Sequence, residues 1–230
     1  MYNADSLKKA VMENEAIFAE LYGKENVKAQ QERYIKAIDR FIEIYGEKDE
    51  LYIFSAPGRT EISGNHTDHN HGCVIAGSID LDMIAVASPR KDGVMHVQSE
   101  GFDELIVTPD MTHAADPARF GTSHALVAGM ANGFVESGYA VGGFDAMATS
   151  DVFRGSGLSS SAAYEVMIGT ILNHLYNNGS IDAITIAKLS QRAENVFFGK
   201  PCGLMDQMAS SVGGFTHIDF ADPDAPAVRK

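Results

Sequence analysis

Residues 154–169 read RGSGLSSSAAYEVMIG, a glycine-rich turn that runs directly into an apolar, helix-forming segment. Gly155 and Gly157 allow the backbone to approach an anion closely, and Ser159, Ser160 and Ser161 fall in the expected first helical turn. Unpaired N–H groups and the positive end of the helix dipole favour phosphate at such a turn. The segment matches neither the GxxxxGK[ST] phosphate loop nor the GxSxG nucleophile elbow. A serine-capped helix after an ordinary turn is the alternative without a ligand.

Outward from this turn, the hydrophobic pattern predicts a mixed α+β fold. Apolar residues near helical spacing predict two helices within the first fifty residues, and further helices over 124–137, 159–176 and 184–198. Short β-rich runs predict strands at LYIFSAP, CVIAGSI, DMIAVASP, VMHVQSE, FDAMATS and GGFTHIDF. We therefore expect a two-layer α+β domain over residues 51–230, with a helical extension over residues 1–50 that packs on it.

Composition and charge exclude several classes of protein. The 230 residues are 45% apolar, and 18 Lys and Arg against 31 Asp and Glu give a net charge of −13. Such an acidic chain disfavours nucleic acids and anionic membranes as partners, although one local turn can still hold an anionic small molecule. Two cysteines are too few for a disulfide framework, and the sequence contains neither a secretory signal nor a long apolar run. We expect a cytoplasmic protein without a membrane span.

A polar loop, APGRTEISGNHTDHNHG at residues 56–72, lies between two predicted strands. Its density of donors and acceptors suits the recognition of a polyhydroxylated ligand such as a sugar. Two other interpretations remain open: a metal site for zinc or iron, since imidazole and carboxylate suit these ions, and a solvated loop without a ligand. The polar residues are Arg59, Glu61, Asn65, His66, Asp68, His69, Asn70 and His71, of which His66, Asp68, His69 and His71 are the candidate metal ligands.

The segment QRAENVFFGKPCGLMDQMASSVGG, residues 191–214, contributes two acids in apolar surroundings. Glu194 lies on a predicted helix, and Asp206 follows a turn that contains glycine and proline. Burial raises the pKa of a carboxyl group, whereas a nearby cation such as Arg59 lowers it. Whether Arg59 and Asp206 meet depends on the fold, because the two residues are far apart along the chain.

In this order, the three segments resemble the galactokinase branch of the GHMP family of small-molecule kinases. PGRTEISGNHTDHNHG is similar to the family's PGRxNxIGEHTDYNxG, FRGSGLSSSA to PxGxGLSSSA, and AENVFFGKPCGLMDQ to AExxFxGxPCGxMDQ. The resemblance covers residues 51–219 and implies the ribosomal protein S5 domain 2-like fold of the GHMP kinase N-terminal domain. In the family a further C-terminal domain completes the nucleotide cleft; because the chain lacks that domain's motif, we expect it to phosphorylate poorly or not at all by itself.

The resemblance also implies a role for each matching residue. It implies a sugar kinase that uses ATP and Mg²⁺, with galactose converted to galactose 1-phosphate as the expected reaction. Asp206 and Arg59 would form the catalytic pair, while Ser161 and Glu194 would bind Mg²⁺. The expected sugar contacts are Asn65, His66, Asp68 and Gly203, and the expected phosphate contacts are Gly155, Ser156, Gly157, Leu158, Ser159, Ser160 and Ser161.

Four positions depart from the family pattern and leave the preferred sugar open. Asn65 replaces a Glu, Glu61 an Asn, His69 a Tyr and Phe153 a Pro. The change at Asn65 matters most, because an amide cannot satisfy the same sugar hydroxyls as a carboxylate that only accepts hydrogen bonds. Two alternatives therefore remain: a non-catalytic sugar or nucleotide sensor related to such kinases, and a metal-dependent hydrolase built on the loop 66–71.

Overall fold

The computed structural model describes residues 2–153, 155–222 and 225–230, and the chain divides into two compact units. The first unit contains Met1–Ser55, Ile84–Ile106 and Gly142–Thr149, and the second contains Ala56–Met83, Val107–Val141 and Ser150–Lys230. Two long strands, β1 (Tyr52–Ser63) and β2 (Cys73–Arg90), contribute residues to both units.

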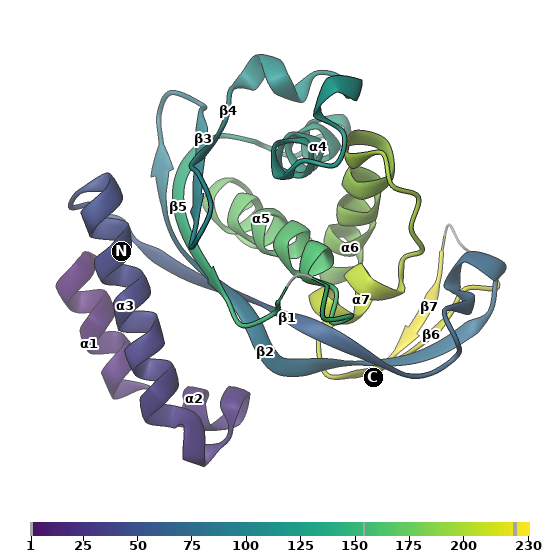
Figure 1. Cartoon of the computed structure of the whole chain (residues 1–230), viewed down its shortest axis with the longest axis horizontal. Helices are drawn as coiled ribbons and strands as arrows, with labels where there is room; N and C mark the ends of the chain where they lie inside the picture. The colour runs from purple at the N-terminus through teal and green to yellow at the C-terminus, as the bar shows by residue number, and fades with distance from the viewer. Residues whose placement is uncertain (1, 154, 223–224) are drawn as a thin grey trace. The chain divides into compact units, whose positions relative to one another are not determined.

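The first unit packs three helices against a sheet. Figure 1 shows α1 (Ala4–Glu13) and α2 (Glu15–Tyr22) beside the longer α3 (Val27–Tyr45). The side chain of Asn3 accepts a hydrogen bond from the Ser6 N–H and so caps α1. The helices bury apolar residues such as Ile38 and Phe41 against residues of the sheet, including Ile84. The other strands of this unit are β3 (Met95–Ser99), β4 (Leu105–Val107) and β5 (Gly143–Ser150), with β3 and β5 parallel.

The second unit carries the helices and strands that hold the candidate site. Its core joins Val74 of β2 and Ile218 of β6 (Phe215–Asp219) to Met205 and Met208 of α7 (Met205–Val212). Strand β6 is antiparallel to both β2 and β7 (Ala227–Arg229). The elements are α4 (Ser123–Glu136), α5 (Ser160–Asn177), α6 (Ala183–Arg192), a π-helix η5 (Ala193–Phe198), α7 (Met205–Val212), β6 (Phe215–Asp219) and β7 (Ala227–Arg229) (Figure 1).

Short 3₁₀ helices occupy several of the connections between these elements. They are η1 (Lys24–Asn26), η2 (Thr67–Asn70), η3 (Pro109–Thr112) and η4 (Pro117–Arg119).

The predicted mixed α+β class is confirmed, with differences in detail. Two helices were predicted within the first fifty residues, but the first of them is divided at Asn14 into α1 and α2. The runs CVIAGSI and DMIAVASP form one continuous strand, β2, rather than two. The predicted helix over 184–198 changes from α to π at residue 193, and β4, β7 and α7 were not predicted. The predicted boundary after residue 50 stays a prediction; in the structure the first 55 residues share a unit with two later segments. Within the described residues, none of the helices combines the length and apolar character needed to cross a bilayer.

Candidate active site

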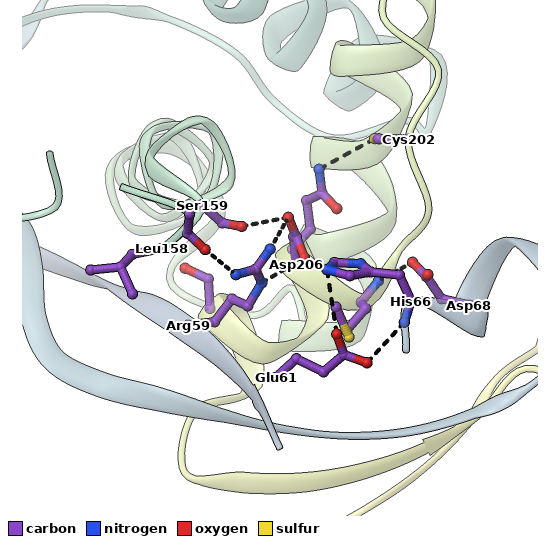
Figure 2. Close-up of polar contacts among 12 residues, drawn as sticks. Arg59, Glu61, His66, Asp68, Leu158, Ser159, Cys202 and Asp206 are labelled. Carbon is purple, nitrogen blue, oxygen red and sulfur yellow. Dashed lines mark hydrogen bonds and ion pairs between the residues drawn. The ribbon is translucent and has the colours of Figure 1, made fainter. Parts of the chain in front are cut away.

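Arg59 and Asp206 are in direct contact in the second unit. Arg59 lies on β1, and its Nε and Nη2 donate to Asp206 Oδ1 at 2.6 Å and Oδ2 at 2.8 Å, a two-pronged ion pair (Figure 2). The Arg59 side chain is 9% exposed, whereas that of Asp206, in the first turn of α7, is 30% exposed. The carboxylate is therefore held on one side by a buried cation and is open to solvent on another.

The glycine-rich turn is joined to the same arginine. Arg59 Nη1 donates to the carbonyl of Gly157 at 2.6 Å, and the backbone N–H of Arg59 donates to the carbonyl of Leu158 at 3.1 Å. A Cβ on Gly58 would lie 2.9 Å from that Leu158 oxygen, so the close approach of the two segments requires glycine. One side chain, that of Arg59, thus contacts both Asp206 and the glycine-rich turn and keeps them close together.

The turn leads into α5 with the geometry of an anion site. Gly155 and Gly157 have φ of 76° and 78°, and Ser159, which precedes α5, has φ of 61°. The hydroxyl of Ser159 donates to Asp206 instead of capping the helix (Figure 2). The N-terminal N–H groups of this 18-residue helix therefore lack a side-chain cap at the turn, and N–H groups in this position favour an anion. The predicted contact of Ser159 with phosphate stays a prediction; in this structure its hydroxyl donates a hydrogen bond to Asp206.

The polar loop contains a run of left-handed backbone. Asn65, His66 and His71 have φ between 52° and 58°, a region that asparagine and histidine adopt more readily than most residues. Glu61 holds this backbone: its Oε1 accepts the N–H of His66 at 2.8 Å, and its Oε2 lies 3.4 Å from His66 Nε2 (Figure 2). Two departures from the family pattern, Glu61 and Asn65, therefore have a local structural role.

Asp68 connects this loop to the start of α7. The residue is buried, and its Oδ2 accepts the backbone N–H of Met205 at 3.1 Å. A Cβ on Gly203 would lie only 1.8 Å from the same oxygen, so Asp68 occupies the space that a side chain at position 203 would fill. Asp68 and Gly203 are thus neighbours, and Asp68 also positions the helix that carries Asp206. Their contact with a sugar stays a prediction.

Ser161 and Glu194, the predicted Mg²⁺ ligands, lie close together next to the turn. Ser161 Oγ donates to Glu194 Oε1 at 3.4 Å, and Glu194 is 2% exposed in the π-helix η5. π-helical turns are often found at functional sites because they redirect one side chain. Hard oxygen ligands suit Mg²⁺, which binds few protein groups and keeps its remaining positions for water and phosphate. The donor set therefore fits this ion, although Lys200 Nζ lies on the same Glu194 oxygen at 3.1 Å.

A second buried carboxyl group, that of Glu165, is connected to Glu194 through the side-chain amide of Gln207. One amide nitrogen, Gln207 Nε2, donates to Glu194 Oε2 at 2.8 Å and to Glu165 Oε2 at 3.2 Å. Burial, and then the negative charge of Glu194, raise the pKa of Glu165 well above its usual value. Neither Glu165 nor Gln207 was predicted as a site residue, although Glu165 follows Ser161 by four residues and so lies on the same face of α5.

The other predictions for this region have mixed outcomes. The loop residues His66, Asp68, His69 and His71 were considered as metal ligands; among the residues that the structure describes, no three or more His, Cys, Asp or Glu side chains are grouped to hold a metal. A cavity of about 370 Å³ is lined by Asp68 and Gly203, two of the predicted sugar contacts, but not by Asp206. The cavity is lined by Asp68, His69, His71, Gln191, Cys202, Gly203, Leu204 and Phe220.

Two family models match separate parts of the chain. The Galactokinase galactose-binding signature matches residues 39–89, and the GHMP kinases N terminal domain matches residues 125–214. The first match contains Arg59 and the polar loop, whereas the second contains the glycine-rich turn, Glu194 and Asp206.

Curated relatives and solved structures agree with these matches. The chain is 37% identical over 186 residues to galactokinase from Streptomyces coelicolor and 34% identical over 188 residues to galactokinase from Bacillus subtilis, covering 80% of this chain each time. It covers only 47% of either relative, so it spans about half their length.

Among solved structures, Lactococcus lactis galactokinase complexed with galactose matches with a TM-score of 0.75 and 27% identity, over 83% of this chain and 50% of that one. Methanococcus jannaschii mevalonate kinase matches with a TM-score of 0.65 at 17% identity, over 80% of this chain and 56% of that one, which shows a shared fold alone.

Proposed function

Because the chain belongs to the galactokinase branch of the GHMP kinase family, corresponding to its N-terminal portion, we propose that it is the sugar- and phosphate-binding part of an ATP-dependent galactose kinase. The observation that carries the proposal is the contact of Arg59 with both Asp206 and the glycine-rich turn. It brings a carboxylate to an anion site, which is what transfer of a phosphoryl group to a hydroxyl requires.

In this proposal the chain's own residues align the reactants and compensate charge. Asp206 would accept a hydrogen bond from the attacking sugar hydroxyl and take its proton as the new O–P bond forms. The bond between the transferred phosphorus and the β–γ bridging oxygen would break in the same step, and ADP would leave with that oxygen. Arg59 stabilises the negative charge of that carboxylate and lies beside the turn where the phosphoryl group would be held. The partial exposure of Asp206 leaves room for the hydroxyl to reach it.

The remaining roles follow from position. The N–H groups at the start of α5 would bind phosphate oxygens, and Asp68 would accept hydrogen bonds from sugar hydroxyls near Gly203. Ser161 and Glu194 would hold Mg²⁺, which supplies neutralisation of phosphate charge when bound. The part of the nucleotide cleft that the matched relatives carry in their other half would come from a further domain.

Two alternatives are less well supported. A sugar or nucleotide sensor has no need of a carboxylate held by an arginine at the phosphate turn, and this feature favours the kinase. A hydrolase built on the loop 66–71 would require its histidines to converge, but His66 is directed to Glu61 instead.

The test has two stages. First, D-galactose is titrated into the ¹⁵N-labelled 230-residue chain, and we expect shifts at the amides of His66, Asp68 and Gly203. Second, the chain is co-expressed with the C-terminal half of the Streptomyces coelicolor relative, co-purification verifies assembly, and ADP release is measured with galactose, N-acetylgalactosamine and arabinose. The chain alone is expected to release little or no ADP.

Variants of the assembled pair then test the catalytic residue. Asp206→Asn is expected to lower turnover by about 10²- to 10⁴-fold, the usual contribution of a general base. Asp103→Asn, which changes an exposed acid outside the site, is the matched control and should leave turnover unchanged. Near-normal turnover by Asp206→Asn would refute the catalytic assignment, and sugar binding without turnover in an assembled, unmutated pair would favour the sensor.

A further inference from the structure

Glu165 is a buried acid that the proposed reaction does not use. It lies on α5, one helical turn after Ser161, and is 0% exposed. Its Oε2 accepts one hydrogen bond, from Gln207 Nε2 at 3.2 Å. Within the described residues, its other oxygen, Oε1, has no hydrogen-bond partner, and neither has Gln207 Oε1.

Packing alone does not account for a carboxyl group at this position. An apolar side chain of similar length would fill the same volume without the cost of removing a carboxyl from water. Burial raises the pKa of Glu165 and so favours its neutral form, in which its carbonyl oxygen still accepts a hydrogen bond. The feature that only a polar side chain supplies here is the acceptor for Gln207.

The Gln207 amide is the link between Glu165 and the proposed site. An amide NH₂ group has two hydrogens, and three acceptors lie near this one: Glu194 Oε2 at 2.8 Å, Glu165 Oε2 at 3.2 Å and Cys202 Sγ at 3.6 Å. The two carboxyl oxygens are the nearer and stronger acceptors, because a thiol sulfur accepts hydrogen bonds only weakly. With Glu194 Oε2 held by this amide, its Oε1 faces Ser161 at 3.4 Å. Gln207 also follows Asp206 directly, so both side chains extend from the first turn of α7.

We propose that Glu165 is a positioning residue: its carboxyl oxygen fixes the Gln207 amide, which in turn keeps Glu194 directed at Ser161 for binding a divalent cation. The metal-binding part rests on the proposed function, since Glu194 is a metal ligand only there. The orientation of Gln207 and Glu194 is a property of the chain itself and is measurable without a metal.

The experiment uses the 230-residue chain and three variants. Glu165→Met removes the acceptor, Glu165→Gln retains a carbonyl oxygen, and Tyr164→Phe is the matched control, because it removes a buried hydroxyl from the same helical turn outside this network. One readout is the pair of side-chain NH₂ resonances of Gln207. The other is a Mn²⁺ titration, in which paramagnetic broadening of the amides of Ser161 and Glu194 reports binding.

We expect Glu165→Met to shift the Gln207 NH₂ resonances and to weaken Mn²⁺ binding by about 10- to 100-fold, as loss of a group that orients a metal ligand does. Glu165→Gln and Tyr164→Phe should resemble the unmutated chain in both readouts. The proposal is wrong if Glu165→Met changes neither readout. It is also wrong if Glu165→Gln weakens Mn²⁺ binding and shifts the Gln207 resonances as much as Glu165→Met does.

Two further results are also decisive. If Mn²⁺ does not broaden these amides in the unmutated chain, the metal assignment under the proposed function fails, and the Gln207 resonances alone decide on positioning. If Glu165→Met does not fold, Gln207→Met is used instead, because it removes the amide that Glu165 contacts. Unchanged Mn²⁺ binding by folded Gln207→Met would overturn the proposal.

Discussion

Replacing Arg59 by lysine tests whether the arginine fork holds the site together. Lysine keeps the positive charge but offers a single ammonium group in place of a planar fork. Arg59 makes three side-chain hydrogen bonds, two to Asp206 and one to the carbonyl of Gly157. An ammonium group at this position can retain one contact with the carboxylate but cannot span both oxygens and the carbonyl, so two of the three bonds are lost.

The cost follows from the number and environment of these bonds. A hydrogen bond that involves a charged group contributes about 1.5–3 kcal/mol when buried. The Arg59 side chain is 9% exposed, so solvent weakens its hydrogen bonds little. The Asp206 side chain is 30% exposed, so water can replace part of the hydrogen bonding that the carboxylate loses. We therefore expect Arg59→Lys to lower the free energy of unfolding by about 2–4 kcal/mol, which is less than two fully buried charged hydrogen bonds would contribute together.

The assay is urea unfolding monitored by hydrogen exchange of the amides in α5 and α7, because both helices belong to the unit that contains Arg59. Arg119→Lys is the matched control: it changes an arginine of the same unit that is 40% exposed and paired with an exposed aspartate. Exposed pairs of this kind contribute little, so this variant should match the unmutated chain. If Arg59→Lys also matched it, the fork would not be what holds Asp206 to the turn.

Three further predictions test other contacts. Gly203→Ala places a Cβ 1.8 Å from Asp68 Oδ2, and the resulting displacement of the buried carboxylate should cost about 2–4 kcal/mol in urea unfolding; full retention of stability would contradict the packing argument. Lys200→Met removes the cation that lies 3.1 Å from Glu194 Oε1, so Mn²⁺ should bind about fivefold more tightly, as removal of ~1 kcal/mol of competing charge predicts; weaker binding would mean that Lys200 assists. Asp182 accepts two hydrogen bonds from the first turn of α6, and these lower its pKa below 3.8. Asp182→Ala should therefore cost about 1 kcal/mol at pH 7, and this difference should disappear as the pH falls below 3.8 and through the folded pKa; a difference independent of pH would exclude the carboxylate as its source.

Local features of the chain were predictable because they depend on residues close together in the sequence. The glycine-rich turn followed by a helix was expected, and α5 begins at Ser160 as the serine run indicates. Helical periodicity predicted α4 to within a few residues, because burial of one helix face repeats every three to four positions. The sequence motifs also identified the family, which depends on residue identity and order and not on distances.

The tertiary structure alone decided which of these residues meet. Arg59 and Asp206 are 147 residues apart, and whether their side chains form an ion pair depends on how β1 and α7 pack. The burial of Glu165, its link to Glu194 through Gln207 and the fit of Asp68 against Gly203 likewise arise from segments that no short window contains. Hydrophobic periodicity encodes which face of an element is buried, but a carboxyl's partner is set by distances of a few ångströms between elements, and these exist only in the folded chain.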